Sequence, residues 1–111
     1  MSTDTLNVES IDVEALKASA SKASALLKSL SHSDRLLLLC QIVGSGEACV
    51  RDLEQSTGIK QPSLSQQLGV LRENGLVNTR REGRQIFYSI ASEDALAVMQ
   101  VLYQRFCATD E

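Results

Sequence analysis

The chain has 111 residues and a formal net charge of −3, with 43% hydrophobic and 23% charged residues. This length fits one small domain, and the composition is typical of a soluble globular protein rather than a disordered one. No apolar run approaches the roughly 20 residues of a membrane-spanning helix, and the start, MSTDTLNVES, lacks the features of a signal peptide. We therefore expect a cytoplasmic protein without membrane association, a setting in which disulfides are usually transient or redox-sensing.

The first thirty residues predict a tail followed by a helix. Residues 1–10 are expected to be flexible, and a single domain is expected to fill residues 11–108. A helix is predicted over residues 11–30, because apolar side chains recur at spacings of three and four and share one face. These side chains are Leu16, Ala20, Ala23, Leu27 and Leu30.

Three more helices are predicted before residue 75. Capping residues in SHSD precede a helix from Ser33 to Val43, which is apolar nearly all round and therefore expected to be buried. A short helix over VRDLEQSTG ends at Gly58, since glycine readily takes the conformation that follows a helix. The fourth helix begins near Pro62, which suits a first helical turn, and Asn74 follows it. Its inward stripe consists of Leu64, Leu68 and Leu71.

The spacing of apolar residues changes after residue 75. The stretch LVNTRREGRQIFYSI alternates and is rich in β-formers, which predicts a β-hairpin with its turn at Glu82-Gly83. A last helix is predicted from Ser92 or Glu93 to about Cys107. It carries two apolar stripes, which is more than a small monomer easily covers, so we expect part of this helix to form a dimer surface.

The predicted order is α-α-α-α-β-β-α, a mainly helical winged helix-turn-helix. The recognition helix of this fold enters the major groove of DNA, where glutamine reads adenine and serine contacts bases or phosphates. Residues 60–84 hold five basic and two acidic residues, a local charge of +3 that leaves −6 on the remainder. A basic stripe on an acidic body points to a polyanion. Charge alone leaves a solvated charged face equally open.

The strings SHSDRLLLLCQI and PSLSQQLGVLRENGLVNTRREGRQIFYSI resemble the ArsR/SmtB family of bacterial winged-helix repressors. The resemblance covers about residues 11–107. It implies a homodimer built on the first and last helices, which binds double-stranded operator DNA until a ligand relieves repression. An anti-repressor, or another winged helix that binds protein, is the rival from a different class.

The resemblance also implies which residues of the recognition helix face DNA. These are Gln61, Ser63, Ser65 and Gln66. Lys60 stands where the family usually has a serine, which leaves the cap of this helix in question but adds a phosphate contact. In the hairpin, we expect Arg80, Arg81 and Arg84 at the tip, where they would lie along phosphates or enter the minor groove.

Metal sensing is common among relatives in this family and depends on the cysteines and histidines present. The family's Cys-x-Cys pair corresponds here to EACVRDL, in which Cys49 is followed by Arg51 at the second position, and a cation there opposes metal binding. The last helix offers Glu93 and Asp94 but no histidine, and the sole histidine, His32, stands at a helix start. We therefore expect neither a metal nor another cofactor, and keep a metal sensor that uses Cys49 as an alternative.

Cys40 and Cys107, 67 residues apart, predict a different sensor. They match the two cysteines of the sulfide-responsive branch of the family, which contains the BigR, SqrR, YgaV and HlyU types. The resemblance implies that reactive sulfur species link the two by a disulfide or a polysulfide chain and that DNA is then released. Cys107 is the expected attacker and Cys40 the resolver, in a pocket lined by Leu37, Tyr103 and Phe106. Peroxide sensing by the same thiols is the alternative, and Cys40 alone also fits a small hydrophobic core residue.

An enzyme is not expected. The sequence contains no Ser/His/Asp triad, no phosphate-binding loop and no paired-carboxylate signature.

Overall fold

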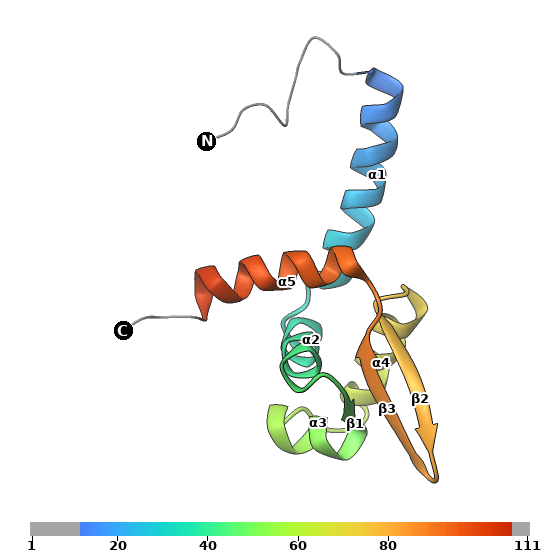
Figure 1. Ribbon diagram of the computed structural model, residues 1–111, viewed down its shortest axis with the longest axis vertical. Coiled ribbons are helices and arrows are strands. Elements are labelled where there is room, and N and C mark those ends of the chain that lie inside the picture. Colours follow the sequence, from blue (N-terminus) through green and yellow to red (C-terminus); the bar gives the residue numbers. More distant parts are fainter. Residues whose placement is uncertain (1–11, 108–111) are drawn as a thin grey trace.

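A computed structural model describes residues 12–107 of the chain. It contains α1 (Val13–Leu30), α2 (Ser33–Ser45), β1 (Ala48–Cys49), α3 (Val50–Thr57), α4 (Ser63–Glu73), β2 (Val77–Glu82), β3 (Gln85–Ile90) and α5 (Glu93–Phe106). This is the predicted winged helix-turn-helix with one short strand added between α2 and α3 (Figure 1). The tail predicted for residues 1–10 lies outside the described residues.

Local capping decides where several helices begin and end. α1 begins at Val13, two residues later than predicted, because the Asp12 carboxylate accepts a hydrogen bond from the Glu14 N–H at 3.1 Å. His32 Nδ1 accepts from the Asp34 N–H at 3.2 Å and so caps α2. α3 ends at Gly58, whose φ of 76° lies in the left-handed region that favours glycine.

The hydrophobic core lies where α2, α3 and α4 meet the hairpin and α5. Its largest fully buried side chains are Leu38, Leu39, Ile42, Leu53, Leu64, Leu68 and Leu71. This set includes the whole inward stripe predicted for α4. The prediction that α2 is buried holds for Leu38, Leu39 and Ile42, but it was wrong for Leu37, which is 43% exposed.

The hairpin belongs to a three-stranded antiparallel sheet with the order β1-β3-β2. Glu82 pairs with Gln85, so the turn lies at Gly83 and Arg84, one residue later than predicted. On the other edge of β3, Cys49 of β1 pairs with Phe87. Strand β1 was not predicted because two residues are too few to show an alternating pattern.

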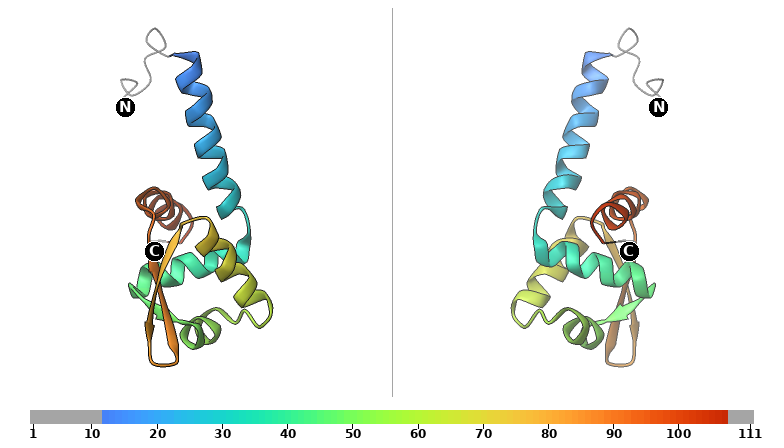
Figure 2. Two further views of the ribbon diagram at one scale, coloured as in Figure 1. Left: turned by 90° about the vertical axis from the view of Figure 1, so that its right-hand side faces the viewer. Right: turned by 90° about the vertical axis from the view of Figure 1, so that its left-hand side faces the viewer.

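Two helices carry apolar side chains that the monomer leaves exposed. The N-terminal part of α1 projects away from the rest of the protein (Figures 1 and 2), and α1 buries only Ser29 and Leu30. On α1, Leu16 and Leu27 are 51% and 56% exposed, and on α5 Phe106 is 77% exposed. The two apolar stripes of the last helix predict a dimer surface there, and the family resemblance implies one on the first helix as well. Exposed apolar side chains on both helices are what such a surface requires.

Among residues 12–107, no helix combines the length and the hydropathy that a membrane crossing requires.

Candidate functional site

Cys40 and Cys107 line the same small pocket between α2 and α5. The pocket has a volume of about 280 Å³, and its other lining residues are Leu36, Met99, Leu102, Tyr103 and Phe106. Cys107 follows the last turn of α5, where its backbone N–H donates to the Tyr103 carbonyl oxygen at 2.8 Å. Both cysteines are free thiols. The fold therefore brings together two thiols that are distant in the sequence.

One wall of the predicted pocket was assigned wrongly. Tyr103 and Phe106 line it as predicted, but Leu36 takes the place given to Leu37. Neighbouring residues of a helix point about 100° apart, so an unbroken run of leucines does not reveal which of them faces α5.

The two thiols differ in their surroundings. Cys40 is half-buried and Cys107 is exposed. Burial raises the pKa of Cys40 above its ordinary value, and a negative charge on Cys107 raises it further. Because the thiolate is the reactive form, the raised pKa and the partial burial of Cys40 both slow its reaction at neutral pH. This arrangement suits a first reaction at Cys107, with Cys40 reacting second.

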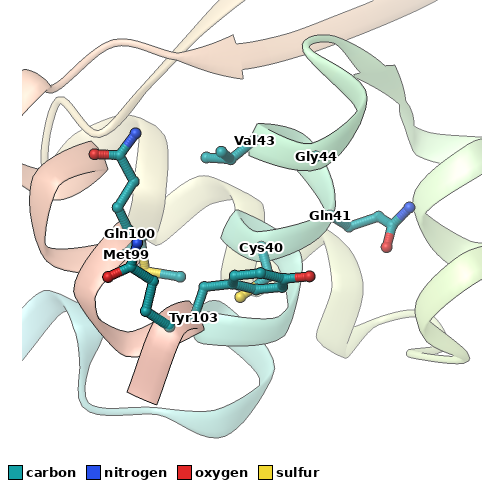
Figure 3. Close-up of a pocket in the computed structure, with 8 residues that line it drawn as sticks. Cys40, Gln41, Val43, Gly44, Met99, Gln100 and Tyr103 are labelled. Carbon is teal, nitrogen blue, oxygen red and sulfur yellow. The ribbon is translucent and has the colours of Figure 1, made fainter. Parts of the chain in front are cut away.

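A larger groove of about 660 Å³ runs beside Cys40. It is lined by Cys40, Gln41, Val43, Gly44, Met99, Gln100, Tyr103 and Gln104. Figure 3 shows Tyr103 reaching from α5 toward Cys40 on α2, while the Gln41 amide extends away from α5. The groove shares Cys40, Met99 and Tyr103 with the thiol pocket. The groove therefore gives small molecules a route to Cys40.

Cys49 lies apart from the thiol pocket. It is 5% exposed, stands at the N-terminal cap of α3 and pairs with Phe87 through β1. Within the described range 12–107, no three His, Cys, Asp or Glu side chains gather in a way that could hold a metal ion. Cys49 is thus a buried residue at the junction of β1 and α3.

The recognition helix α4 exposes part of the predicted DNA-contacting set. Lys60, Gln61, Ser65 and Gln66 are exposed. The Pro62 cap position offers no side-chain acceptor, and Gln61 Oε1 instead accepts from the Ser65 N–H at 3.1 Å. Gln61 thereby supplies the cap that the sequence left in question. Ser63 is half-buried and its hydroxyl donates to Asp34 Oδ2 at 3.4 Å, so it faces α2.

The three hairpin arginines have different environments. Arg84 lies in the turn, and Arg81 Nε donates to the Gly83 carbonyl oxygen at 3.3 Å close to it. Arg80 is not at the tip, where it was expected, because it lies further down β2 opposite Phe87. Its guanidinium lies 4.8 Å from the centre of that ring.

Two carboxylates hold the Arg80 guanidinium. Its Nε and Nη2 donate to the two Glu47 oxygens at 2.8 and 2.9 Å, and Nη1 donates to Glu82 at 2.8 Å. The hydrogen bonds to Glu47 and Glu82 hold the pKa of Arg80 above its usual range, and Glu47 makes the larger contribution. The hydrogen bond from Arg80 in turn lowers the pKa of Glu47. The positive charge of Arg80 is therefore balanced within the protein, which leaves Arg81 and Arg84 as the cations at the hairpin end.

Sequence patterns did not predict the role of Arg35. Its Nε donates to the Ser29 carbonyl oxygen at 2.6 Å and its Nη1 donates to Gln67 Oε1 at 2.9 Å. A single arginine at the start of an otherwise apolar helix could have indicated this role. A charged side chain next to a hydrophobic core needs hydrogen-bond partners.

Comparison with known proteins gives consistent results at three levels. The bacterial regulatory protein family arsR matches residues 32–79. A biofilm growth-associated repressor from Agrobacterium fabrum is 52% identical over 86 residues, which is 78% of this chain and 73% of the relative. The crystal structure of the transcriptional repressor BigR from Xylella fastidiosa superimposes with a TM-score of 0.79 at 47% identity, covering 89% of this chain and 100% of the other. Reduced HlyU from Vibrio cholerae gives a TM-score of 0.80 at 34% identity, covering 85% and 98%.

Proposed function

The chain belongs to the ArsR family of bacterial regulatory proteins, and on that premise we propose that it is a dithiol-based, persulfide-responsive repressor. It is a DNA-binding transcriptional regulator and not an enzyme, as the family and its relatives are. In the proposed mechanism, the reduced protein binds operator DNA and releases it when Cys40 and Cys107 are linked. The observation that carries this proposal is the shared pocket, which holds one free thiol from α2 and one from the end of α5.

The linking reaction starts at the exposed thiol. The Cys107 thiolate attacks the outer sulfur of a hydropersulfide, R–S–SH, so that Cys107 becomes a persulfide and the thiol RSH leaves. The Cys40 thiolate then attacks Sγ of Cys107, which forms the Cys40–Cys107 disulfide and releases hydrogen sulfide. The two protein thiols lose two electrons, and the outer sulfur gains them as it becomes sulfide. If a second hydropersulfide first transfers its outer sulfur to the Cys107 persulfide and RSH leaves, attack of the Cys40 thiolate on the sulfur next to Cys107 Sγ gives a trisulfide and again releases hydrogen sulfide.

The character of the pocket supports a sulfur inducer. Apart from the two cysteines, its lining is aliphatic and aromatic and includes the thioether of Met99, an environment that suits soft, polarizable sulfur. Its volume of about 280 Å³ leaves room for extra sulfur atoms between the two cysteines.

We further propose that the repressor is a cytoplasmic homodimer joined through α1 and α5. Their exposed apolar side chains favour association. A two-fold dimer presents two α4 helices to successive major grooves, with half-sites roughly 34–36 Å apart on a near-palindromic operator. Lys60, Gln61, Ser65, Gln66, Arg81 and Arg84 are the exposed candidates for contact with that DNA.

The test measures DNA affinity before and after persulfide treatment. A labelled duplex is first selected from a random-sequence library by the reduced wild-type protein. We expect treatment with glutathione persulfide to weaken binding by the wild type and by Cys49→Ser, the matched cysteine control, but not by Cys107→Ser. If Cys107→Ser releases the duplex as the wild type does, the dithiol mechanism is wrong. Release by peroxide at the same dose would favour general redox sensing.

A further inference from the structure

We infer that Asp34 and Arg35, at the start of α2, position the recognition helix α4 and transmit the state of the two thiols to it. This inference rests on the proposed function and adds the route by which the thiol pocket acts on DNA binding. We call the contacts of these two residues with Ser63 and Gln67 the α2–α4 clamp.

The Arg35 side chain joins three helices. Its Nε donates to the Ser29 carbonyl oxygen at 2.6 Å, and Nη2 lies 3.4 Å from the Lys28 carbonyl oxygen, so it binds the C-terminal end of α1. Its Nη1 donates to Gln67 Oε1 on α4 at 2.9 Å. A guanidinium is planar and holds its donors in a fixed fork. These three helices are therefore held in one orientation by a single rigid group.

Asp34 makes the second contact with α4. Its Oδ2 accepts from the Ser63 hydroxyl at 3.4 Å, while its backbone N–H donates to the cap of α2 at His32. Ser63 and Gln67 are four residues apart in α4, so they lie on one face of this helix. Ser65 and Gln66 are on the exposed side. A rotation or shift of α2 therefore changes how that exposed side is presented to DNA.

The same helix carries the thiol pocket. Leu36 lines the pocket and directly follows Arg35, and Cys40 lies five residues beyond Arg35. Five residues of α-helix span about 7.5 Å. Leu38 and Leu39, which lie between Arg35 and Cys40, are fully buried. Any movement of this part of α2 therefore involves the whole segment as one rigid unit.

Linking the sulfurs changes the relation between α2 and α5. A disulfide fixes the separation of two Cβ atoms at about 3.5–4.5 Å, so α2 and the end of α5 must adopt the spacing that the bond requires. Because the clamp lies on α2 next to the pocket, that adjustment reaches Ser63 and Gln67. The clamp is therefore intact in the reduced, DNA-binding state and displaced in the linked state.

Removing the clamp from the Gln67 side tests this route. Gln67→Ala deletes the acceptor of Arg35, and Gln67→Glu keeps an acceptor at the same place. Gln55→Ala, an exposed glutamine of α3, is the control. Each variant is titrated with the selected duplex when reduced and after treatment with glutathione persulfide, and the Cys40–Cys107 link is verified by mass.

The informative quantity is the ratio of linked to reduced dissociation constants. A hydrogen bond to a charged group is worth enough to change affinity about tenfold. We expect Gln67→Ala to weaken the reduced complex by about that factor and leave the linked protein unchanged, so the ratio falls about tenfold. Gln67→Glu and Gln55→Ala should keep the wild-type ratio. A purely structural role would weaken both states equally and leave the ratio as it was.

Two outcomes overturn the inference in distinguishable ways. If Gln67→Ala keeps the wild-type ratio while the wild type releases DNA on linking, the clamp does not transmit the signal and the proposed function stands. If the linked wild type retains its affinity, the proposed function itself fails, and the clamp has no signal to transmit. Arg35→Lys is a second variant, and we expect it to lower the ratio because a lysine lacks the planar fork.

Discussion

Cys40 combines a packing role with a chemical one. It packs against the buried core cluster, yet it lines both the thiol pocket and the neighbouring groove. A leucine at this position would keep an apolar contact with the core but could not form a link with Cys107. At the scale of single residues, the function therefore depends on a cysteine that is sufficiently buried to be a weak nucleophile and sufficiently open to be reached.

The raised pKa of Cys40 predicts the order of labelling. With the protein fully reduced at pH 7.5, we expect iodoacetamide to modify Cys107 well before Cys40, because burial keeps Cys40 protonated. The rate at Cys40 should climb only at alkaline pH. Peptide mapping by mass spectrometry gives both rates from one sample, and faster labelling of Cys40 at pH 7.5 would contradict the assignment of Cys107 as the attacker.

The same shift has a consequence for stability. The folded state holds the Cys40 proton more tightly than the unfolded chain does, since its folded pKa is the higher one. Cys40 therefore contributes to the free energy of unfolding at pH values below the ordinary thiol pKa. This contribution is lost as the pH rises through the raised pKa of the folded state.

At the scale of secondary-structure elements, the hairpin presents unequal cations. Arg80 is balanced by Glu47 and Glu82, whereas Arg81 and Arg84 lie near the turn. The acidic partner that matters most, Glu47, lies 33 residues away in the sequence, on the segment between α2 and β1. Charge counting over residues 60–84 could not include it.

This difference predicts distinct salt dependences for the hairpin variants. Arg81→Ala and Arg84→Ala should each weaken DNA binding and flatten the slope of log K against log salt by about one unit per lost phosphate contact. Arg80→Ala should change the slope less, and Glu47→Gln should steepen it because one balancing charge is removed. Fluorescence anisotropy titrations measure the slope for each of the four variants. A range of about 50 to 200 mM salt resolves this slope. Equal slopes for every variant would remove the hairpin from the interface.

Most helices and the hairpin were predictable from the sequence because each has a periodic apolar face. The stripe of Leu64, Leu68 and Leu71 and the alternation in the hairpin are examples. Strand β1 and the exposure of Leu37 were not, since a two-residue strand has no period and an all-apolar helix does not mark its buried side.

The candidate site was predictable to a different extent. Resemblance pointed to Cys40 and Cys107, and both cysteines line one pocket. The partners of Arg80 and Arg35 were not predictable, because they come from elements that are distant in the sequence and meet only in the folded chain.

At the scale of the whole molecule, the described chain leaves two helices incompletely covered. α1 projects from the rest of the protein (Figure 2). Leu16 and Leu27, which belong to its apolar stripe, stay exposed. A small domain with this much uncovered apolar surface gains stability from association. We therefore expect dimerisation, stability and DNA binding to depend on one another.

A charge on the apolar face of α1 should separate the protomers. We expect Leu16→Asp to shift the protein toward monomer and to weaken operator binding, because burying a carboxylate in an apolar interface is costly. Ala18→Asp is the matched control, since residue 18 lies about 200° around the helix from Leu16 and is also exposed. Sedimentation velocity measures both, and an unchanged dimer for Leu16→Asp would exclude this face of α1 from the interface.

The most direct test of the central claim is the mass of the reduced protein after treatment with glutathione persulfide, with hydrogen peroxide in parallel. We expect persulfide to give a species in which Cys40 and Cys107 are joined by a disulfide or by a chain with whole sulfur atoms added, while Cys49 stays free and peroxide at the same dose produces neither. Absence of the link, or equal disulfide formation with both oxidants, would contradict persulfide sensing and leave a DNA-binding repressor whose inducer lies elsewhere.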